Sequence, residues 1–140
     1  MKILISVASL LFFAACGNDD TLDDVYVDYD QAFTLRIGQR AITSDGAQLK
    51  LIDIPTDSRC ALNATCIWEG EIVAELEGAH GGVSIPIELK HSPDQTDPAT
   101  ANFIRFQVEL IEANPYPDLN KKNGQIKRDD YELTLVLRAE

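Results

Sequence analysis

Two cysteines close together have the spacing in this chain that most directly predicts chemistry. Cys60 and Cys66 are separated by five residues. A thioredoxin-type redox couple requires Cys-x-x-Cys, and a zinc site requires four ligands, for which only His80 and His91 remain as histidine donors. The spacing therefore favours a structural disulfide, with a redox couple or a metal site as the alternatives.

The residues just before this cysteine pair include a candidate binding group. Asp57 and Arg59 are two residues apart, and Glu69 follows a few residues after Cys66. Arg59 either pairs with Asp57 and so holds the loop, or binds an anion. The local pair is the simpler expectation, because the two side chains are already neighbours in the chain.

Two aromatic residues are further candidates for binding. Trp68 belongs to an alternating segment and is predicted to point inward and pack over the disulfide; the alternative is an exposed platform for a ligand. Tyr116 lies between two prolines and is expected at a rigid turn, with its ring as a candidate contact for another protein.

No pattern in the sequence predicts a catalytic residue, a cofactor or a metal. His80 and His91 both lie beside expected turns, where solvated histidines are common. No Gly-x-Ser-x-Gly motif occurs. Four glutamates alternate along one segment, at positions 69, 71, 75 and 77, and such a row is typical of a solvated sheet face.

The first sixteen residues have the pattern of a targeting segment. Lys2 precedes an uncharged run of thirteen residues, from Ile3 to Ala15, whereas a membrane span needs roughly 20 apolar residues. The run ends Phe-Ala-Ala-Cys-Gly, which resembles the lipobox of bacterial lipoproteins. This resemblance implies a signal peptide over residues 1–15, lipidation of Cys16 and a bacterial envelope location, at the outer membrane and facing the periplasm or the surface. Export of this kind also permits a disulfide.

The segment after Cys16 is expected to be an acidic tether over residues 16–31. Residues 17–31 contain six Asp and no Lys or Arg, within a chain of net charge -11. Like charges repel and favour an extended chain, although Val25, Val27 and Tyr29 are spaced for a strand late in this segment. Residues 32–140 are predicted to form a single domain. The acidic balance argues against a nucleic acid partner.

Apolar residues recur at every second position through most of residues 32–140. This alternation covers residues 33–37, 49–54, 68–77, 83–90, 104–110 and 131–138, with a change of face at Ile52 that indicates a bulge. Pro86 cannot donate to a ladder and predicts an edge strand. The fold class is therefore all-β: a small antiparallel β-sandwich, Ig-like or Greek-key, with a partly open barrel as the alternative.

The sequence around the cysteines also resembles a family of small uncharacterised bacterial lipoproteins. Residues 57–60 read Asp-Ser-Arg-Cys and residues 66–70 read Cys-Ile-Trp-Glu-Gly, similar to that family's D-S-R-C-P…C-x-W-x-G motif. Ala61 stands where the family usually has proline. The resemblance implies location and probable fold, and no activity.

Three functions remain open at this level. The first is a non-enzymatic binding or assembly module, anchored to the membrane by its lipid, with an envelope protein or a glycan as partner. The second is a small hydrolase or metal-dependent enzyme using His80 or His91 with nearby acids. The third is an inhibitor of secreted hydrolases presenting the loop at residues 91–101 or the loop at 114–129.

Overall fold

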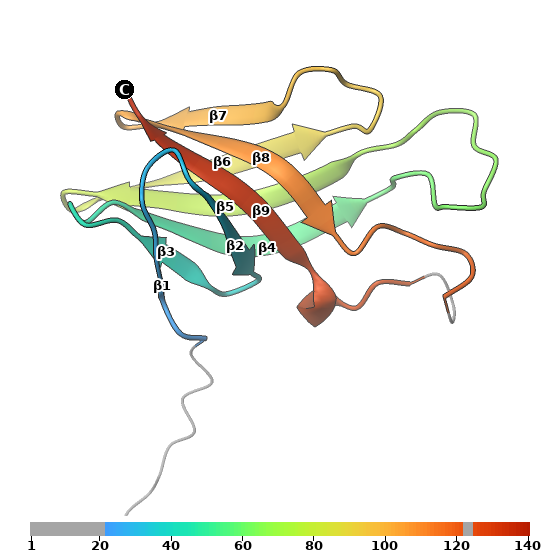
Figure 1. The fold of residues 1–140 in the computed structure, drawn as a ribbon, viewed down its shortest axis with the longest axis horizontal. Coiled ribbons are helices and arrows are strands. Elements are labelled where there is room, and N and C mark those ends of the chain that lie inside the picture. Colours follow the sequence, from blue (N-terminus) through green and yellow to red (C-terminus); the bar gives the residue numbers. More distant parts are fainter. Residues whose placement is uncertain (1–21, 122–124) are drawn as a thin grey trace, which may run out of the picture.

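Two β-sheets pack face to face in the part of the chain described by this computed structural model, residues 22–121 and 125–140 (Figure 1). One sheet contains, in spatial order, β1 (Val25–Tyr26), β3 (Arg40–Ile42), β4 (Gln48–Asp57), β5 (Ile72–His80) and β6 (Val83–His91). The other contains β2 (Ala32–Arg36), β9 (Glu132–Ala139), β8 (Phe106–Asn114) and β7 (Ala99–Phe103). The only helix among the described residues is a short 3-10 turn, η1 (Arg128–Asp130). The predicted β-sandwich is therefore confirmed.

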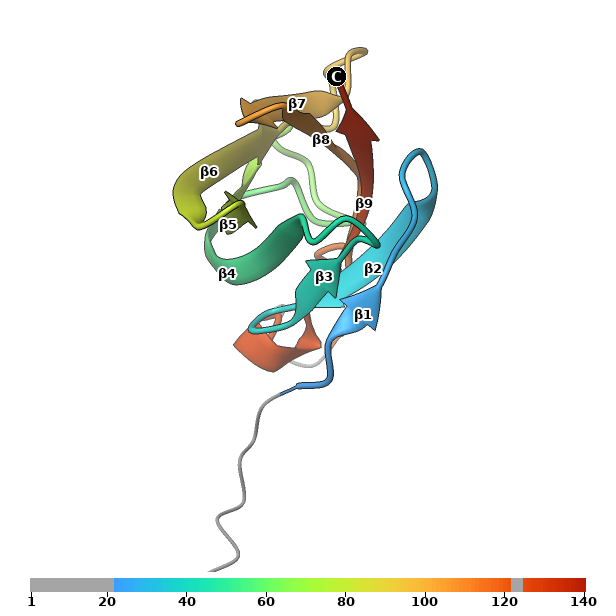
Figure 2. The ribbon, with the colours of Figure 1, turned by 90° about the vertical axis from the view of Figure 1, so that its left-hand side faces the viewer.

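The core lies between the two sheets and follows from the two-residue period. In β2, Phe33 and Leu35 are buried while their neighbours are exposed, and the other long strands alternate in the same way over part of their length. Figure 2, an end-on view, shows the two sheets enclosing this interior. The largest fully buried side chains come from both sheets: Leu35, Leu49, Leu51, Ile72, Leu76, Leu89, Phe106, Val108, Leu133, Leu135 and Leu137.

Several details of the sheets agree with the predictions from the sequence, but one predicted strand begins later than expected. The register of β4 against β5 shifts on either side of Asp53, as the change of face at Ile52 predicts. Pro86 lies in β6, an edge strand. Ile104, however, is not in a strand: it has a φ of 55° in the two-residue turn between β7 and β8 and is exposed. Ile104 fitted the predicted alternation because it stands two residues before Phe106, which is buried and begins β8.

The segment at residues 25–31, expected to belong to the tether, is part of the sandwich. β1 pairs in parallel with β3, and the Val27 amide donates to the Ile42 carbonyl at 3.0 Å. The ring of Tyr29 stacks on Phe106 with centroids 5.8 Å apart. The domain therefore begins before residue 32, because alternating apolar side chains outweigh the local negative charge once they can reach the core.

Two aspartates of the expected tether, Asp24 and Asp30, are paired with arginines of the sandwich. Asp24 accepts from Arg40 at 2.7 Å, and Asp30 accepts from Arg138 at 3.0 Å. Arg138 also contacts Glu109 at 2.8 Å, so one guanidinium joins the segment to β8 and β9. Part of the acidity assigned to a tether is thus neutralised within the fold. The predicted signal peptide and the lipidated Cys16 lie outside the described residues.

The turn between β3 and β4 contains a carboxylate that should make stability sensitive to acid. Asp45 accepts hydrogen bonds from the hydroxyls of Thr43, at 2.6 Å, and Tyr29, at 2.7 Å. These bonds, chiefly the one from Thr43, lower the pKa of Asp45 to about 2. A lowered folded-state pKa gives stability that is present above the ordinary pKa of an aspartate, near 4, and is lost as the pH falls through about 2.

We expect Asp45→Asn to lower the melting temperature at pH 7, with a difference from wild type that shrinks between pH 4 and pH 2. Circular dichroism melts across that range measure this, and Asp97→Asn, at an exposed loop position, removes the same charge as a control. A difference that stays constant down to pH 1.5 would contradict the assignment.

Candidate functional site

The candidate site lies at one end of the sandwich, where three connections meet. The loop between β4 and β5 covers residues 58–71 and projects beyond the sheets at the right of Figure 1, near the connection from β8 to β9. A parallel bridge between Leu62 and Asp118 joins these two segments. The third connection, between β6 and β7, is joined to the 58–71 loop through Ser92, whose hydroxyl donates to the Gly70 carbonyl at 2.6 Å.

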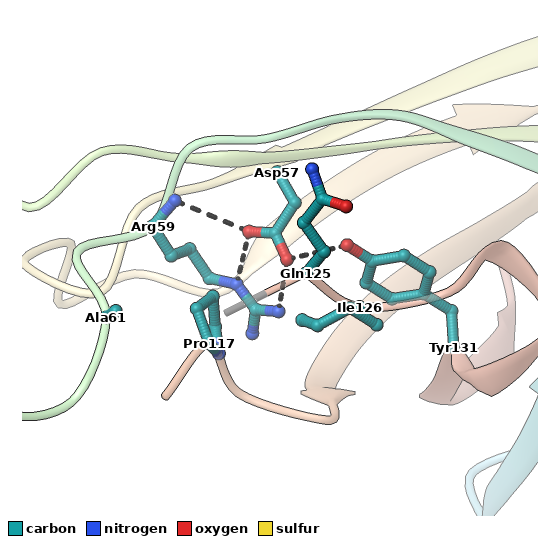
Figure 3. A pocket seen from close by; sticks show the side chains of 7 residues that line it. All are labelled: Asp57, Arg59, Ala61, Pro117, Gln125, Ile126 and Tyr131. Atoms are coloured by element: carbon teal, nitrogen blue, oxygen red, sulfur yellow. Dashed lines mark hydrogen bonds and ion pairs between the residues drawn. The ribbon is translucent and has the colours of Figure 1, made fainter. Parts of the chain in front are cut away.

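A buried ion pair holds the start of this loop. The Nε and Nη2 atoms of Arg59 each donate to an oxygen of Asp57, both at 2.8 Å, and the side chains of Arg59 and Asp57 are only 3% and 6% exposed. This is the local pair that the sequence favoured. Figure 3 shows the Asp57 carboxylate between Arg59 and Tyr131. Because the two charges are paired and buried, Arg59 does not offer a free cation to an anionic ligand.

Arg59 also joins the loop to the end of β8. Its Nη1 donates to the Ala113 carbonyl at 2.8 Å, and its Nη2 donates to the Pro115 carbonyl at 2.9 Å, next to the cis Asn114–Pro115 peptide bond. These carbonyls lie more than fifty residues away in the chain. One guanidinium therefore fixes the position of the loop relative to the other sheet.

Two tyrosines complete the cluster. Tyr131 donates its hydroxyl to Asp57 at 2.9 Å, and the ring of Tyr116 lies 4.7 Å from the Arg59 guanidinium, within cation–π range. Burial, reinforced by the Asp57 carboxylate, raises the pKa of the Tyr131 phenol above its ordinary value, so Tyr131 stays a donor at neutral pH. Tyr116 packs on Arg59 and so supports the loop, and it is half exposed.

A cleft of about 430 Å³ opens beside this cluster (Figure 3). Its polar wall is the Asp57–Arg59 pair with Tyr131, whose hydrogen bonds are largely made within the protein. The cleft can therefore accommodate a small molecule but offers few unpaired groups to orient one. The lining residues are Asp57, Arg59, Ala61, Pro117, Gln125, Ile126 and Tyr131.

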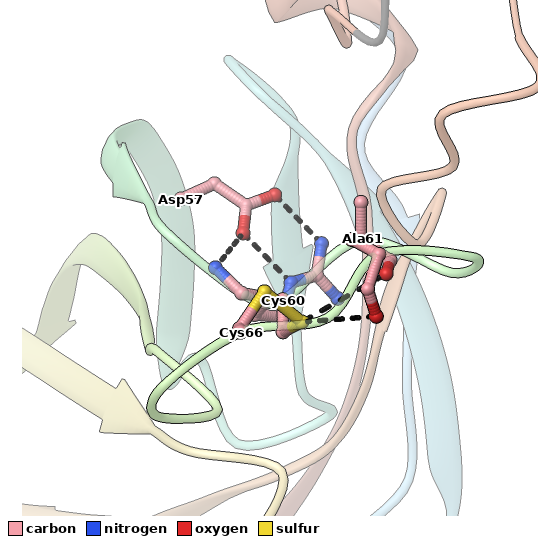
Figure 4. Close-up of a disulfide and its surroundings, with 6 residues drawn as sticks. Asp57, Cys60, Ala61 and Cys66 are labelled. Carbon is pink, nitrogen blue, oxygen red and sulfur yellow. Dashed lines mark hydrogen bonds and ion pairs between the residues drawn. A yellow bond between two sulfur atoms is a disulfide. The ribbon is translucent and has the colours of Figure 1, made fainter.

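The predicted disulfide is confirmed. Cys60 and Cys66 are bonded, with their Cα atoms 6.0 Å apart, and Figure 4 shows the bridge closing the loop. In the chain-entropy model, closing a loop of this length stabilises the fold by about 2–2.5 kcal/mol. The bridge occupies both sulfurs, so neither Cys60 nor Cys66 can ligate a metal as a thiolate while it is intact.

Backbone hydrogen bonds order the rest of the loop. The amides of Ser58 and Cys60 donate to the carbonyls of Glu71 and Glu69, each at 2.8 Å. The Leu62 amide donates to the Pro117 carbonyl at 2.8 Å. The loop is therefore bonded to itself and to a second connection, which makes it a well-ordered element rather than a loosely held one.

The structure contradicts the prediction for Trp68. Its side chain is 64% exposed and lies outside any strand, because β5 begins only at Ile72. Gly70, with a φ of 70°, interrupts the extended backbone between the two, so the alternation that placed Trp68 inward does not extend back to it. Of the four candidate binding residues, the structure brings Asp57, Arg59 and Tyr116 together and leaves Trp68 at the surface.

Three other exposed apolar residues of these two connections were not predicted from the sequence. Ile67 is fully exposed, at 105%, and Leu62 and Leu119 are more than half exposed. A signal was available for Ile67, because it stands beside Trp68 and two adjacent apolar residues cannot both face the core of a half-buried strand. No such signal existed for Leu62 and Leu119, which meet only in the folded chain.

The two histidines do not converge on a common site. His80 ends β5 and His91 ends β6, at opposite ends of the hairpin, about 25 Å apart at the usual rise of a strand. Both are half-buried at strand ends, whereas the sequence predicted solvated loop histidines. The rings of His80 and Phe106 form a T-shaped pair with their centroids 5.2 Å apart. Within residues 22–121 and 125–140, no three His, Cys, Asp or Glu side chains are grouped for a metal ion.

Chemically, this end of the sandwich holds a rigid loop and presents apolar side chains at its tip. No helix in the described part of the chain is long and apolar enough to cross a membrane. A scan of protein-family models, a search of curated proteins and a search of solved structures each found no match for the chain.

Proposed function

We propose that this chain is a lipid-anchored bacterial envelope protein whose β-sandwich is a non-enzymatic binding module. The observation that carries the proposal is the division of roles in the loop at residues 58–71. Asp57, at the end of β4, and Arg59 of the loop form a buried pair that supports the loop, while Leu62, Ile67 and Trp68 lie exposed on it. Exposed apolar side chains, one of them aromatic, on a firmly held loop suit recognition of a protein partner.

The anchor follows from the lipobox-like residues ending at Cys16 and from the resemblance to small bacterial lipoproteins. Since β1 begins at Val25, eight residues connect Cys16 to the sandwich, and the nine steps from Cys16 to Val25 span at most about 30 Å. The tether is thus shorter than the sixteen-residue segment expected, and the sandwich would work close to the membrane surface.

A second candidate function, inhibition of a secreted hydrolase, is favoured by one observation. A short loop closed by a disulfide and held by backbone hydrogen bonds can occupy another protein's cleft at low entropic cost. This observation concerns the loop at 58–71; the loops at 91–101 and 114–129, for which the sequence predicts this role, remain candidates as well. An inhibitor acts by binding its target, so an experiment that tests the binding module also tests this function.

We expect Cys16→Ser in the full chain to move the protein from the membrane fraction to the soluble fraction, because two or three acyl chains are needed for stable anchoring and this variant can carry none. Cell fractionation with immunoblotting measures the shift. Cys60→Ser with Cys66→Ser serves as the control, since it removes thiols without touching the lipid. Unchanged membrane retention of Cys16→Ser would overturn the anchor.

A further inference from the structure

An exposed aromatic side chain lies on the short edge strand β1, close to where the described chain begins (Figure 1). Tyr26 is 82% exposed, and Leu22, four residues before it, is 44% exposed. Val25 and Val27 alternate with Tyr26 and pack against the core. The segment therefore turns its odd-numbered side chains inward and its even-numbered side chains outward, as an extended chain at a sheet edge does.

Contacts with the neighbouring chain place the outward side chains of this segment on one surface. β1 pairs in parallel with β3 at an offset of sixteen positions. Asp24 keeps this offset, because its carboxylate accepts from Arg40 at 2.7 Å. Leu22 keeps it as well, because its Cδ1 atom would lie 3.8 Å from a Cβ placed at Gly38. Leu22, Asp24 and Tyr26 therefore share a side, which we call the β1 face.

The length of chain before the β1 face indicates what lies next to it. Leu22 is six steps from Cys16 in the sequence, and six steps span at most about 22 Å. In the proposed function the acyl chains on Cys16 lie within the bilayer, so this cysteine lies at the level of the headgroups. A connection this short gives the membrane a high effective concentration at the β1 face. A contact too weak to hold a free protein can then form.

The composition of the β1 face suits the headgroup region of a zwitterionic bilayer. Tyrosine is enriched at membrane–water interfaces, because its ring is apolar and its hydroxyl is polar. The charge of Asp24 is neutralised by Arg40. Among the exposed neighbours, Asp23 and Asp28 are acidic and Lys50, opposite Arg40 in β4, is basic. This small excess of negative charge disfavours anionic lipid and is tolerated by lipid without net charge.

We infer that the β1 face contacts the headgroup region of the bilayer that anchors the chain, with zwitterionic phospholipid as its partner. This inference rests on the proposed lipid anchor and adds the surface that meets the membrane. Tyr26 is the main contact, and Leu22 adds aliphatic area. The loop at residues 58–71 lies at the other end of the sandwich, so this contact leaves it uncovered (Figures 1 and 2).

Tryptophan fluorescence of the full, lipid-anchored chain tests the contact. The chain has one tryptophan, Trp68, so the unaltered protein reports on the distant loop. Tyr26→Trp combined with Trp68→Phe moves the single tryptophan to the β1 face. Both proteins are reconstituted in vesicles of phosphatidylethanolamine and phosphatidylcholine, whose acyl chains are brominated near the headgroup and quench adjacent tryptophan. We expect quenching and a blue shift of the emission for a tryptophan at position 26, and neither for Trp68.

Matched variants test whether the face as a whole makes the contact. Leu22→Ser, added to the protein with its tryptophan at position 26, should reduce the quenching. Val83→Ser removes an apolar side chain of comparable exposure, 53% against 44%, from β6 and should leave the quenching unchanged. Partial replacement of the lipid by brominated phosphatidylglycerol should lower the quenching at low ionic strength, because Asp23 and Asp28 repel anionic lipid.

Failure of the anchor and failure of the β1 face give different results. If the unaltered protein does not float with the vesicles on a density gradient, the anchor fails and the inference fails with it. If the protein floats but a tryptophan at position 26 is quenched no more than Trp68, the anchor stands and the β1 face is wrong. Stronger quenching with phosphatidylglycerol would overturn the zwitterionic partner. A blue shift in native membranes without quenching in pure lipid would assign the face to a protein instead.

Discussion

Asp57→Ala is expected to lower the free energy of unfolding by about 3–5 kcal/mol, the largest single effect predicted for this end of the sandwich. The variant leaves the Arg59 guanidinium in a site where its side chain is 3% exposed and its counter-ion Asp57 is gone. It also removes the acceptor of the Tyr131 hydroxyl. The cost comes from the unpaired buried charge rather than from the loss of a favourable pair.

Urea unfolding followed by circular dichroism measures this effect, with two controls. Arg36→Ala breaks an ion pair with Glu132 whose side chains are 58% and 39% exposed, and should cost less than about 1 kcal/mol. Combining Asp57→Ala with Arg59→Met removes both charges and should recover part of the loss, because no buried charge then remains unpaired. A loss for Asp57→Ala no larger than that for Arg36→Ala would show that the pair is not buried in solution.

Gly70→Ala is expected to lower the free energy of unfolding by about 2–5 kcal/mol, from backbone strain and overpacking together. Gly70 has a φ of 70°, which L-residues rarely adopt. A Cβ at this position would also lie 1.8 Å from the Ser58 carbonyl oxygen, a backbone atom that cannot move without displacing the bonded base of the loop. Only glycine allows the two strands of the loop to approach so closely.

The control for Gly70→Ala isolates the clash from the strain. Gly81 has a φ of 59°, but a Cβ there would meet nothing within 4 Å. Gly81→Ala should therefore cost only the strain, about 1–2 kcal/mol or less. The difference between the two variants in urea unfolding measures the cost of the close approach. Equal losses would contradict the close contact between Gly70 and Ser58.

Much of the fold could be predicted from the sequence because most strands carry their own alternating pattern of apolar residues. Alternation at Phe33 and Leu35, and Pro86 at an edge, follow from the side-chain period of two and the missing amide of proline. The Cys60–Cys66 bridge was predictable because the two residues are close in the chain. The short strand β1 was not predicted, since it pairs with residues of β3 that are sixteen positions away in the chain.

The local half of the candidate site could also be anticipated. Asp57 and Arg59 are two residues apart, so their pairing needs little information beyond the sequence. The contacts of Arg59 with Ala113 and Pro115, and of Asp57 with Tyr131, join residues separated by more than fifty positions. No spacing rule predicts such contacts, because they depend on how the two sheets pack.

The sequence by itself determined that this chain is all-β, that its two closely spaced cysteines pair, and that Asp57 and Arg59 are partners, since period and proximity act within a few residues. Only the tertiary structure decided which apolar side chains remain outside. Trp68 was expected in the core, but the left-handed Gly70 separates it from β5, and Leu62 and Leu119 become neighbours only when two distant connections meet. Exposure is a property of the whole chain, because a side chain is buried only if some other segment covers it.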